Sequence, residues 1–235
     1  MDVSKYWMDI DVRLDKLVAN GFVKLPSLKE FDLSIFAENI SKDMLGNTFS
    51  ELCLNHELFL EKIEIKKYLT PKLYNIAKGA FNFKGEITNQ YHVARRVEPG
   101  NSKEMYRAHF DSHLFTLVLP IQIPVSKDNS GCGELIYFPN SRNHPKNEVQ
   151  NIYGKAYNKK FASKEGLDNF SKIHKKYIEN FENLEPILFL GNTTLHTNKQ
   201  VGKSCSSYRL TLLAHFFDPS PKYGIGSLLR FFRSR

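Results

Sequence analysis

The chain has 235 residues, a length that fits one domain of ordinary size and excludes two full enzymatic domains. Its hydrophobic fraction of 41% and its charged fraction of 25% are those of a globular protein and exclude a disordered one. The net charge of +8 is compatible with a nucleic-acid partner, an acidic substrate or a membrane surface. The position of the charges along the chain therefore matters more than their sum.

The first residues and the cysteines both favour a cytoplasmic protein. No run approaches the roughly 18 apolar residues that a membrane span needs. The start, MDVSKYWMDIDVRLDK, carries acidic residues and lacks the apolar stretch of a secretory signal. The cysteines, Cys53, Cys132 and Cys205, are odd in number, far apart in the sequence and outside any CxxC spacing. Neither a disulfide framework nor a thiolate zinc site is therefore predicted.

Residues 1–85 are predicted to be a mainly helical extension that braces the rest of the chain. Apolar residues recur at helical spacing over 4–19, and the segment GFVKLP that follows predicts a short strand. Further helices are predicted over 33–44 and 70–80, because each range begins at residues suited to an N-cap or a first helical turn.

The pattern changes at about residue 86, where short runs rich in β-branched and aromatic residues begin. Each run is bounded by Gly, Pro or Asn, as is typical of a β-barrel or β-sandwich. The runs are EITNQYHVARRVEP, SHLFTLVLPIQIP, GELIYFP, PILFLG and SYRLTLLAHFFDP. We therefore expect a core over residues 86–220, in a mainly β protein with a helical N-terminal part, which is an α+β fold.

A polar stretch near 141–185 interrupts these runs. It contains one predicted helix, over 164–181, with Tyr153, Tyr157 and Phe161 ahead of it. Long connections of this kind often serve as lids or substrate loops, so we expect a lid-like insertion. The aromatic residues are either lid residues or anchors for a surface helix.

A basic amphipathic tail is predicted over 221–235. It contains no acidic residue, and apolar residues lie between its arginines. Such a segment could rest on an anionic lipid surface, which would place the protein at the inner face of a membrane. Packing of the tail on its own domain is the alternative.

Two histidines and an aspartate predict a metal site. His109 and Asp111 are two residues apart on an extended chain, so their side chains point to the same face. His196 lies 85 residues after Asp111, where a strand leads into a turn, and could supply a third ligand. Two imidazoles and one carboxylate on one face of an octahedral ion leave three positions open, and this facial triad suits Fe(II) oxygenases.

Arg209 predicts how a co-substrate is held. A bidentate 2-oxo acid can occupy two of the open positions on the iron and leave the last for dioxygen. Arg209 lies 13 residues beyond His196 on the next predicted strand, where its guanidinium could pair with the distal carboxylate of 2-oxoglutarate. Thr211 shares its face and could donate a further hydrogen bond.

These motifs resemble a known superfamily. Residues 86–218 resemble the double-stranded β-helix core, a jelly-roll or cupin-like barrel, of the Fe(II)/2-oxoglutarate-dependent dioxygenases, in particular small-molecule oxygenases similar to phytanoyl-CoA hydroxylase. The family pattern is HxD, a distal His, and an Arg followed two residues later by Ser or Thr, which here are HFD, His196 and Arg209 with Thr211.

The resemblance implies an activity. We expect Fe(II), 2-oxoglutarate and O2 to act together in hydroxylating a small-molecule, lipid-linked or sugar-linked substrate, with release of succinate and CO2. Halogenating members usually replace the metal-binding carboxylate with a small residue. Asp111 is present here, so hydroxylation, desaturation or a related oxidation is implied instead of halogenation. The resemblance also places Asn89 and Tyr91 on a strand from which family members often contact the co-substrate.

Two further histidines share faces with these residues. His113 continues the alternation from His109 and Asp111, and His215 shares a face with Arg209. Each could lie near the metal or the substrate, but the ordinary expectation for both is a packed core histidine.

Basic residues near the metal pair could meet an anionic substrate such as a phosphate, a carboxylate or a coenzyme A thioester. They are Arg95, Arg96, Lys103 and Arg107, and a solvated basic loop is the default interpretation. Asn140 and Arg142, which follow another strand, could line the mouth of the site.

Three alternative functions remain open. A nucleic-acid demethylase of the same superfamily would show a second arginine six residues after the clamp, where this chain has His215, so nucleic acid is disfavoured as a partner. A non-catalytic metal-binding or ligand-binding barrel would have no use for Arg209 and Thr211. A zinc hydrolase would need a general base that the sequence does not reveal.

Overall fold

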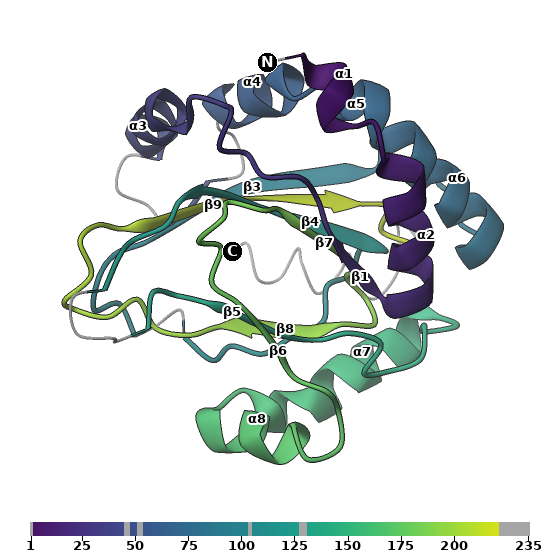
Figure 1. Cartoon of the computed structure of the whole chain (residues 1–235). Coiled ribbons are helices and arrows are strands. Elements are labelled where there is room, and N and C mark those ends of the chain that lie inside the picture. Colours follow the sequence, from purple (N-terminus) through teal and green to yellow (C-terminus); the bar gives the residue numbers. More distant parts are fainter. Residues whose placement is uncertain (1, 45–47, 51–53, 103–104, 127–130, 221–235) are drawn as a thin grey trace.

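The computed structural model describes residues 2–44, 48–50, 54–102, 105–126 and 131–220 (Figure 1). Lys103 and the basic tail predicted over 221–235 lie outside the described residues. No helix of the described part is both long enough and apolar enough to cross a membrane.

Two antiparallel sheets form the centre of the molecule. The larger has the strand order β1-β7-β4-β9-β3-β2, and the smaller has the order β6-β5-β8. The strands of the larger sheet are β1 (Phe22–Lys24), β2 (Phe49–Ser50), β3 (Gln90–Val97), β4 (Phe115–Gln122), β7 (Ile187–Leu190) and β9 (Arg209–Phe216). Those of the smaller sheet are β5 (Leu135–Phe138), β6 (Tyr177–Glu179) and β8 (Leu195–Asn198). The expected α+β fold with a jelly-roll core is confirmed.

Helices cover the outer face of the larger sheet, above it in Figure 1. They are α1 (Val3–Tyr6), α2 (Ile10–Asn20), α3 (Leu33–Asp43), α4 (Leu54–Lys62), α5 (Ile65–Tyr68) and α6 (Thr70–Phe81). The main hydrophobic core lies between these helices and the sheet, and it includes Leu17, Ile40 and Leu73 from helices and Leu117 and Leu212 from strands. The N-terminal part also contributes β1 and β2, the edge strands of the larger sheet.

Strand β9 shows how the alternation of residues divides the two faces of the larger sheet. Leu210, Leu212, Ala214 and Phe216 belong to the core beneath the helices. The residues between them, Arg209, Thr211, Leu213 and His215, therefore lie on the inner face, toward the smaller sheet. Because β9 pairs with both β3 and β4 at the centre of the sheet, its inner residues lie at the middle of the barrel.

The first helix is interrupted, which differs from the continuous helix predicted over 4–19. Helix α1 ends at Tyr6, and α2 begins at Ile10. Trp7, between them, is buried, and its indole N–H donates to the carbonyl of Ile63 at 2.8 Å. Fixing this large ring in the core breaks the helical course of the chain.

The insertion contains more structure than predicted. It forms α7 (Glu148–Asn158), η1 (Lys159–Phe161) and α8 (Lys164–Phe170), and α7 and α8 lie below the smaller sheet in Figure 1. The helix predicted over 164–181 is too long, because α8 ends at Phe170 and residues 177–179 form β6 at the edge of the smaller sheet. There Tyr177 stacks on Tyr137 of β5, with ring centroids 5.3 Å apart, so pairing overrides the helical pattern.

Candidate metal centre

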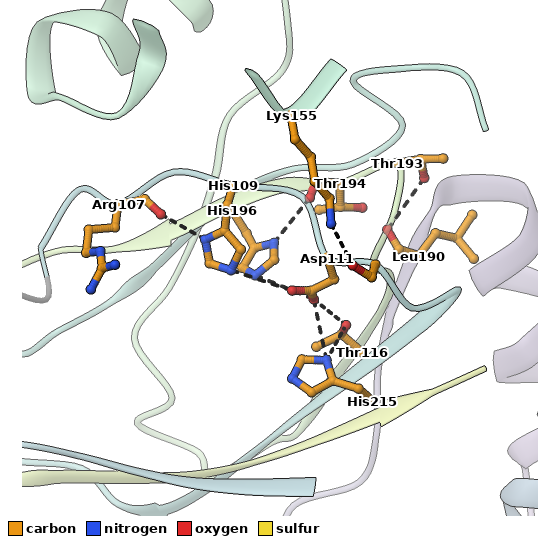
Figure 2. Close-up of polar contacts among 11 residues, drawn as sticks. Arg107, His109, Asp111, Thr116, Lys155, Leu190, Thr193, Thr194, His196 and His215 are labelled. Atoms are coloured by element: carbon orange, nitrogen blue, oxygen red, sulfur yellow. Dashed lines mark hydrogen bonds and ion pairs between the residues drawn. The ribbon is translucent and has the colours of Figure 1, made fainter. Parts of the chain in front are cut away.

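The structure brings His109, Asp111 and His196 together (Figure 2). One ligand atom from each lies within 4.8 Å of the others. Nε2 of His109 is 3.5 Å from Oδ1 of Asp111, and Nε2 of His196 is 3.7 Å from Oδ2. The predicted cluster therefore exists before any ion is bound, with three donors of the type that suits iron.

Backbone pairing holds these three residues in place. His109 and His196 form a β-bridge, in which each amide N donates to the other residue's carbonyl at 3.1 Å. The amide N of Asp111 donates to the carbonyl of Gly191 at 3.0 Å. The HxD segment thus lies against the end of β7 and the start of β8, which brings residues far apart in sequence to one place.

The protonation of both imidazoles is fixed by backbone carbonyls. Nδ1 of His109 is 2.8 Å from the carbonyl oxygen of Arg107, and Nδ1 of His196 is 3.2 Å from that of Thr194. A carbonyl can only accept, so each Nδ1 carries the proton and donates it. Both Nε2 atoms therefore keep a lone pair near Asp111, which is the form that a metal ligand needs.

Burial and charge favour the ionic states that bind a metal. Burial by itself would raise the pKa of Asp111, but His196, His215 and His109 hold that pKa well below its ordinary range. Burial lowers the pKa of His196 to about 4, although the charge of Asp111 opposes the shift. At neutral pH the site therefore offers an ionised carboxylate beside a neutral buried imidazole.

Thr116, which was not predicted from sequence, and His215, for which a place near the metal was one of two interpretations, form an outer layer around Asp111. Oγ1 of Thr116 donates to Oδ2 of Asp111 at 2.5 Å, and Nδ1 of His215 lies 3.1 Å from the same hydroxyl. Because the hydroxyl proton goes to Asp111, the hydroxyl accepts from His215. The only sequence signal was a polar residue within the apolar run of β4.

Gly191 makes room for this outer layer. A Cβ atom at Gly191 would lie 2.6 Å from Oγ1 of Thr116 and 3.1 Å from Cβ of Asp111. Any larger residue would thus displace the hydroxyl or the carboxylate. The carbonyl of Gly191 also accepts from the amide of Asp111, so this residue fixes both the backbone and the side chain of the ligand.

Arg209 and Thr211 lie on the inner face of β9 with unsatisfied polar groups. Arg209 is 2% exposed, and burial lowers its pKa to about 9, with Arg95 acting in the same direction and Glu134 opposing. No ion pair among the described residues includes Arg209, and Glu134 lies near Lys199 instead. The buried hydroxyl of Thr211 has no hydrogen-bond partner in the described part of the chain.

A dicarboxylate co-substrate fits these groups. A buried guanidinium without a partner is costly, and a carboxylate that pairs with it would remove that cost. Gly133 leaves space for the arginine, because a Cβ there would lie 2.7 Å from Cδ of Arg209. The chemistry of Arg209 and Thr211 thus agrees with the predicted 2-oxoglutarate clamp, and the ligand set of the triad agrees with Fe(II).

Asn89 and Tyr91, both on or next to β3, have surroundings that differ from each other. Nδ2 of Asn89 donates to the carbonyl of Asp218 at 3.0 Å, and the amide of Asp218 donates back to Oδ1 at 3.2 Å. These bonds tie Asn89 to the chain that follows β9. Tyr91 lies with His113 and His215 in a group of nearly parallel rings, with centroids 5.2 to 6.0 Å apart. Their predicted contact with the co-substrate stays a prediction.

The predicted basic cluster is divided among different surroundings. Arg96 pairs with Glu98 at 2.6 Å and lies over the ring of Tyr208, whereas the guanidinium of Arg95 lies over the ring of Phe49. Arg107 contacts the metal centre through its backbone carbonyl, which accepts from His109.

The residues predicted at the mouth and in the lid are also dispersed. Arg142 donates to the carbonyl of Asn192 at 2.6 Å and lies over the ring of Phe110. Asn140 accepts a 3.4 Å hydrogen bond from Thr193. Phe161 packs against Phe170, whereas Tyr153 and Tyr157 are exposed. The sequence did not reveal this difference between the three aromatic residues.

Comparison with solved structures shows the fold. A prolyl-4-hydroxylase from Pseudomonas putida matches with a TM-score of 0.52 and 14% identity over 88% of this chain and 97% of its own. A prolyl 4-hydroxylase from Phytophthora capsici matches with a TM-score of 0.54 and 12% identity over 99% of this chain and 73% of its own. A non-heme alpha-ketoglutarate-dependent carbocyclase from nogalamycin biosynthesis matches with a TM-score of 0.51 and 10% identity over 93% and 90%.

Comparison by sequence finds no counterpart. No protein family model and no curated protein matches the chain. Structural likeness at these low identities shows only the fold. The reaction has to be inferred from the residues of the site. The chain therefore has the double-stranded β-helix fold of the Fe(II)/2-oxoglutarate-dependent oxygenases, and it carries a His-Asp-His group of the facial-triad type.

Proposed function

We propose that this protein is an Fe(II)- and 2-oxoglutarate-dependent oxygenase. The observation that carries the proposal is the combination of the His109, Asp111 and His196 cluster with the buried, unpaired guanidinium of Arg209 inside one barrel. A site that only bound a metal would have no need of Arg209, whose burial costs free energy until an anion pairs with it.

Each residue of the site has a distinct role in this proposal. His109, Asp111 and His196 would hold Fe(II), and Thr116 would fix the orientation of the Asp111 carboxylate. Arg209 and Thr211 would bind the distal carboxylate of 2-oxoglutarate by charge-assisted hydrogen bonds. Iron, 2-oxoglutarate and O2 together supply the oxidation of a substrate C–H bond, with release of succinate and CO2. The buried side chains of the two sheets limit the access of water.

We propose a small-molecule substrate, in free form or linked to a lipid or a sugar, with an anionic group. Lys155 of α7, which lies near Asp111 in Figure 2, supports the anionic group, because its Nζ donates at 2.7 Å to Oγ of Ser112, the residue that follows Asp111. A base-modifying enzyme is less well supported, since His215 stands at the position of the second arginine and donates to Thr116. Hydroxylation is the expected outcome.

The test is an anaerobic titration of metal-free protein with Fe(II) and then with 2-oxoglutarate. We expect a visible charge-transfer band from the chelate. His109→Ala should abolish the band, and Arg209→Ala should shift its formation to much higher 2-oxoglutarate concentration. A folded protein that binds Fe(II) but gives no band with 2-oxoglutarate would contradict the proposal and favour a metal-binding barrel. Slow succinate formation in air, dependent on both reagents, is the supporting measurement.

A further inference from the structure

Helix α7 of the insertion presents three of its large apolar side chains to solvent. Val149, Tyr153 and Tyr157 are 64%, 71% and 55% exposed. They lie four residues apart, so in a helix with about 3.6 residues per turn they occupy one face. We call Val149, Tyr153 and Tyr157 the α7 face. A helix at the surface of a globular protein normally has the opposite arrangement, with its apolar side toward the core.

The inward side of α7 is polar and already has partners. Asn151 is buried, and its Oδ1 accepts from Arg142 at 2.8 Å. Lys155 donates to Ser112 at 2.7 Å. These contacts attach the helix to the barrel without any contribution from the α7 face. The exposed apolar side chains are therefore not explained by the packing of this helix.

The segment that carries this face is strongly basic. Residues 146–178 contain eight lysines, three acidic residues and no arginine, which gives a net charge of +5 within a chain whose total is +8. Residues 146–178 thus carry more than half of the excess positive charge, although the acidic residues that follow lower the net charge of the whole insertion, 141–185, to +3. Lys160 is close to the face itself, because its Nζ lies 3.6 Å from the centroid of the Tyr157 ring. The partner of the α7 face must therefore offer apolar groups and also carry negative charge.

We propose that the α7 face, with its neighbouring lysines, binds an anionic phospholipid surface. Tyrosine is favoured at the level of the lipid headgroups, where its ring is in contact with apolar groups and its hydroxyl with water. Val149 would enter the boundary of the acyl chains, and each lysine near the surface would add attraction to anionic lipids.

Two other partners fit the α7 face less well. A nucleic acid would be matched by arginines and stacked aromatics, whereas this segment has no arginine and exposes the aliphatic Val149. A second copy of the chain would bring two segments of charge +5 together, and like charges oppose that contact. The charge of residues 146–178 thus favours a lipid surface.

The position of α7 relates this surface to the candidate metal centre. Val149, Tyr153 and Tyr157 face outward, while Lys155 on the other side of the same helix donates to Ser112, the residue that follows Asp111. Binding through the α7 face would therefore hold the metal centre close to the lipid surface, where a substrate carried by lipid could reach it. Lipid binding itself does not depend on the proposed oxygenase function.

The experiment is co-sedimentation of the whole chain with vesicles. We expect binding to phosphatidylcholine vesicles that contain phosphatidylglycerol, little binding to phosphatidylcholine alone, and weaker binding at high salt. The double variant Tyr153→Ser with Tyr157→Ser should lower the partition coefficient by about fivefold or more. Ile35→Ser is the matched control, because Ile35 is an exposed apolar residue, 56% exposed, on α3 at the opposite side of the molecule in Figure 1.

Three outcomes would overturn the proposal. The first is no binding to the anionic vesicles. The second is binding that the double variant leaves unchanged, which would assign the lipid contact to another part of the chain. The third is loss of self-association or of oligonucleotide binding in the double variant, with vesicle binding unaffected, which would assign the α7 face to a second copy or to nucleic acid. Circular dichroism of each variant would establish that it is folded.

Discussion

The hydroxyl of Thr116 donates to one carboxylate oxygen of Asp111, with 2.5 Å between Oγ1 and Oδ2. This bond occupies one carboxylate oxygen, the same atom that lies 3.6 Å from Nδ1 of His215. Oδ1, which faces His109, remains for the metal. The pair therefore determines the orientation of the only anionic ligand in the candidate site, as second-layer partners of metal ligands commonly do.

Replacement of Thr116 by valine should weaken iron binding. Valine has nearly the same shape but cannot donate, so Asp111 would lose the bond that orients it. We expect Fe(II) affinity to fall by about 10-fold to 100-fold. Thr116→Ser keeps the hydroxyl and should retain most of the affinity. Anaerobic titration with Fe(II) measures both. Equal affinities for valine and serine variants would show that the hydrogen bond has no part in metal binding.

Gly191→Ala should disturb the same site by steric contact. The added Cβ would lie 2.6 Å from Oγ1 of Thr116, which is closer than packed atoms allow. We expect lower Fe(II) affinity and a loss of about 1–3 kcal/mol in the free energy of unfolding, measured in urea. Gly79→Ala is the control, because a Cβ at this position of α6 meets no atom within 4 Å. That substitution should stabilise the protein by about 0.5–1 kcal/mol.

Arg209→Met should separate stability from co-substrate binding. The guanidinium is 2% exposed and has no ion pair in the described structure, so its burial costs free energy in the absence of a ligand. We therefore expect the metal-free variant to melt at the same temperature as the parent protein or above it. The parent with Fe(II) should gain about 2.7 kcal/mol of stability from 2-oxoglutarate at about 100 times its Kd. The variant should gain none at that concentration.

A lower melting temperature for metal-free Arg209→Met would contradict this account. It would mean that the guanidinium stabilises the unliganded protein through the ring of Phe181, whose centroid is 5.6 Å from Cζ of Arg209. Phe181→Leu would then lower the melting temperature by a similar amount. Differential scanning calorimetry of both variants would show whether the buried guanidinium costs stability or is stabilised by the ring of Phe181.

Much of the fold could be predicted because its strands carry their own signal. The runs that contain β3, β4, β5, β7 and β9 are apolar, β-branched or aromatic, and bounded by residues that favour turns. Helix α7 carried no such signal, because its inward side holds Asn151 and Lys155, while Val149, Tyr153 and Tyr157 face outward. The spacing of apolar residues predicts a helix that packs by an apolar face, and it does not reveal a helix attached by polar contacts.

The metal ligands were predictable for a related reason. His109 and Asp111 have a fixed spacing, and His196 belongs to the same motif. Thr116, by contrast, is one threonine among many, and only the fold places it against Asp111. Cys132 and Cys205 give a second example: they are far apart in sequence, yet their Sγ atoms lie 3.9 Å apart without a disulfide. Contacts between residues so far apart in sequence follow from the order of the strands in the sheets, which could not be predicted from the sequence.

His56 should make the stability of the protein depend on pH. This residue of α4 is 1% exposed, and its Nε2 has no hydrogen-bond partner in the described structure. Burial lowers the pKa of His56 to about 4; the neighbouring His92 acts in the same direction, and Glu57 opposes it. In the unfolded chain the pKa returns to about 6.5. The folded state therefore keeps His56 neutral over a range of pH in which the unfolded state binds a proton.

The sign of the effect follows from this difference. Because the unfolded state binds more protons, stability falls as the pH drops through about 6.5, and the loss from His56 is complete below about 4. The loss should reach at most about 3 kcal/mol. Urea unfolding of metal-free protein and of His56→Leu, each at pH 7 and pH 4.5, isolates this contribution, because all other titrating groups are common to both. The variant should lose less stability between the two pH values, and an equal loss in both proteins would show that His56 is protonated in the folded state.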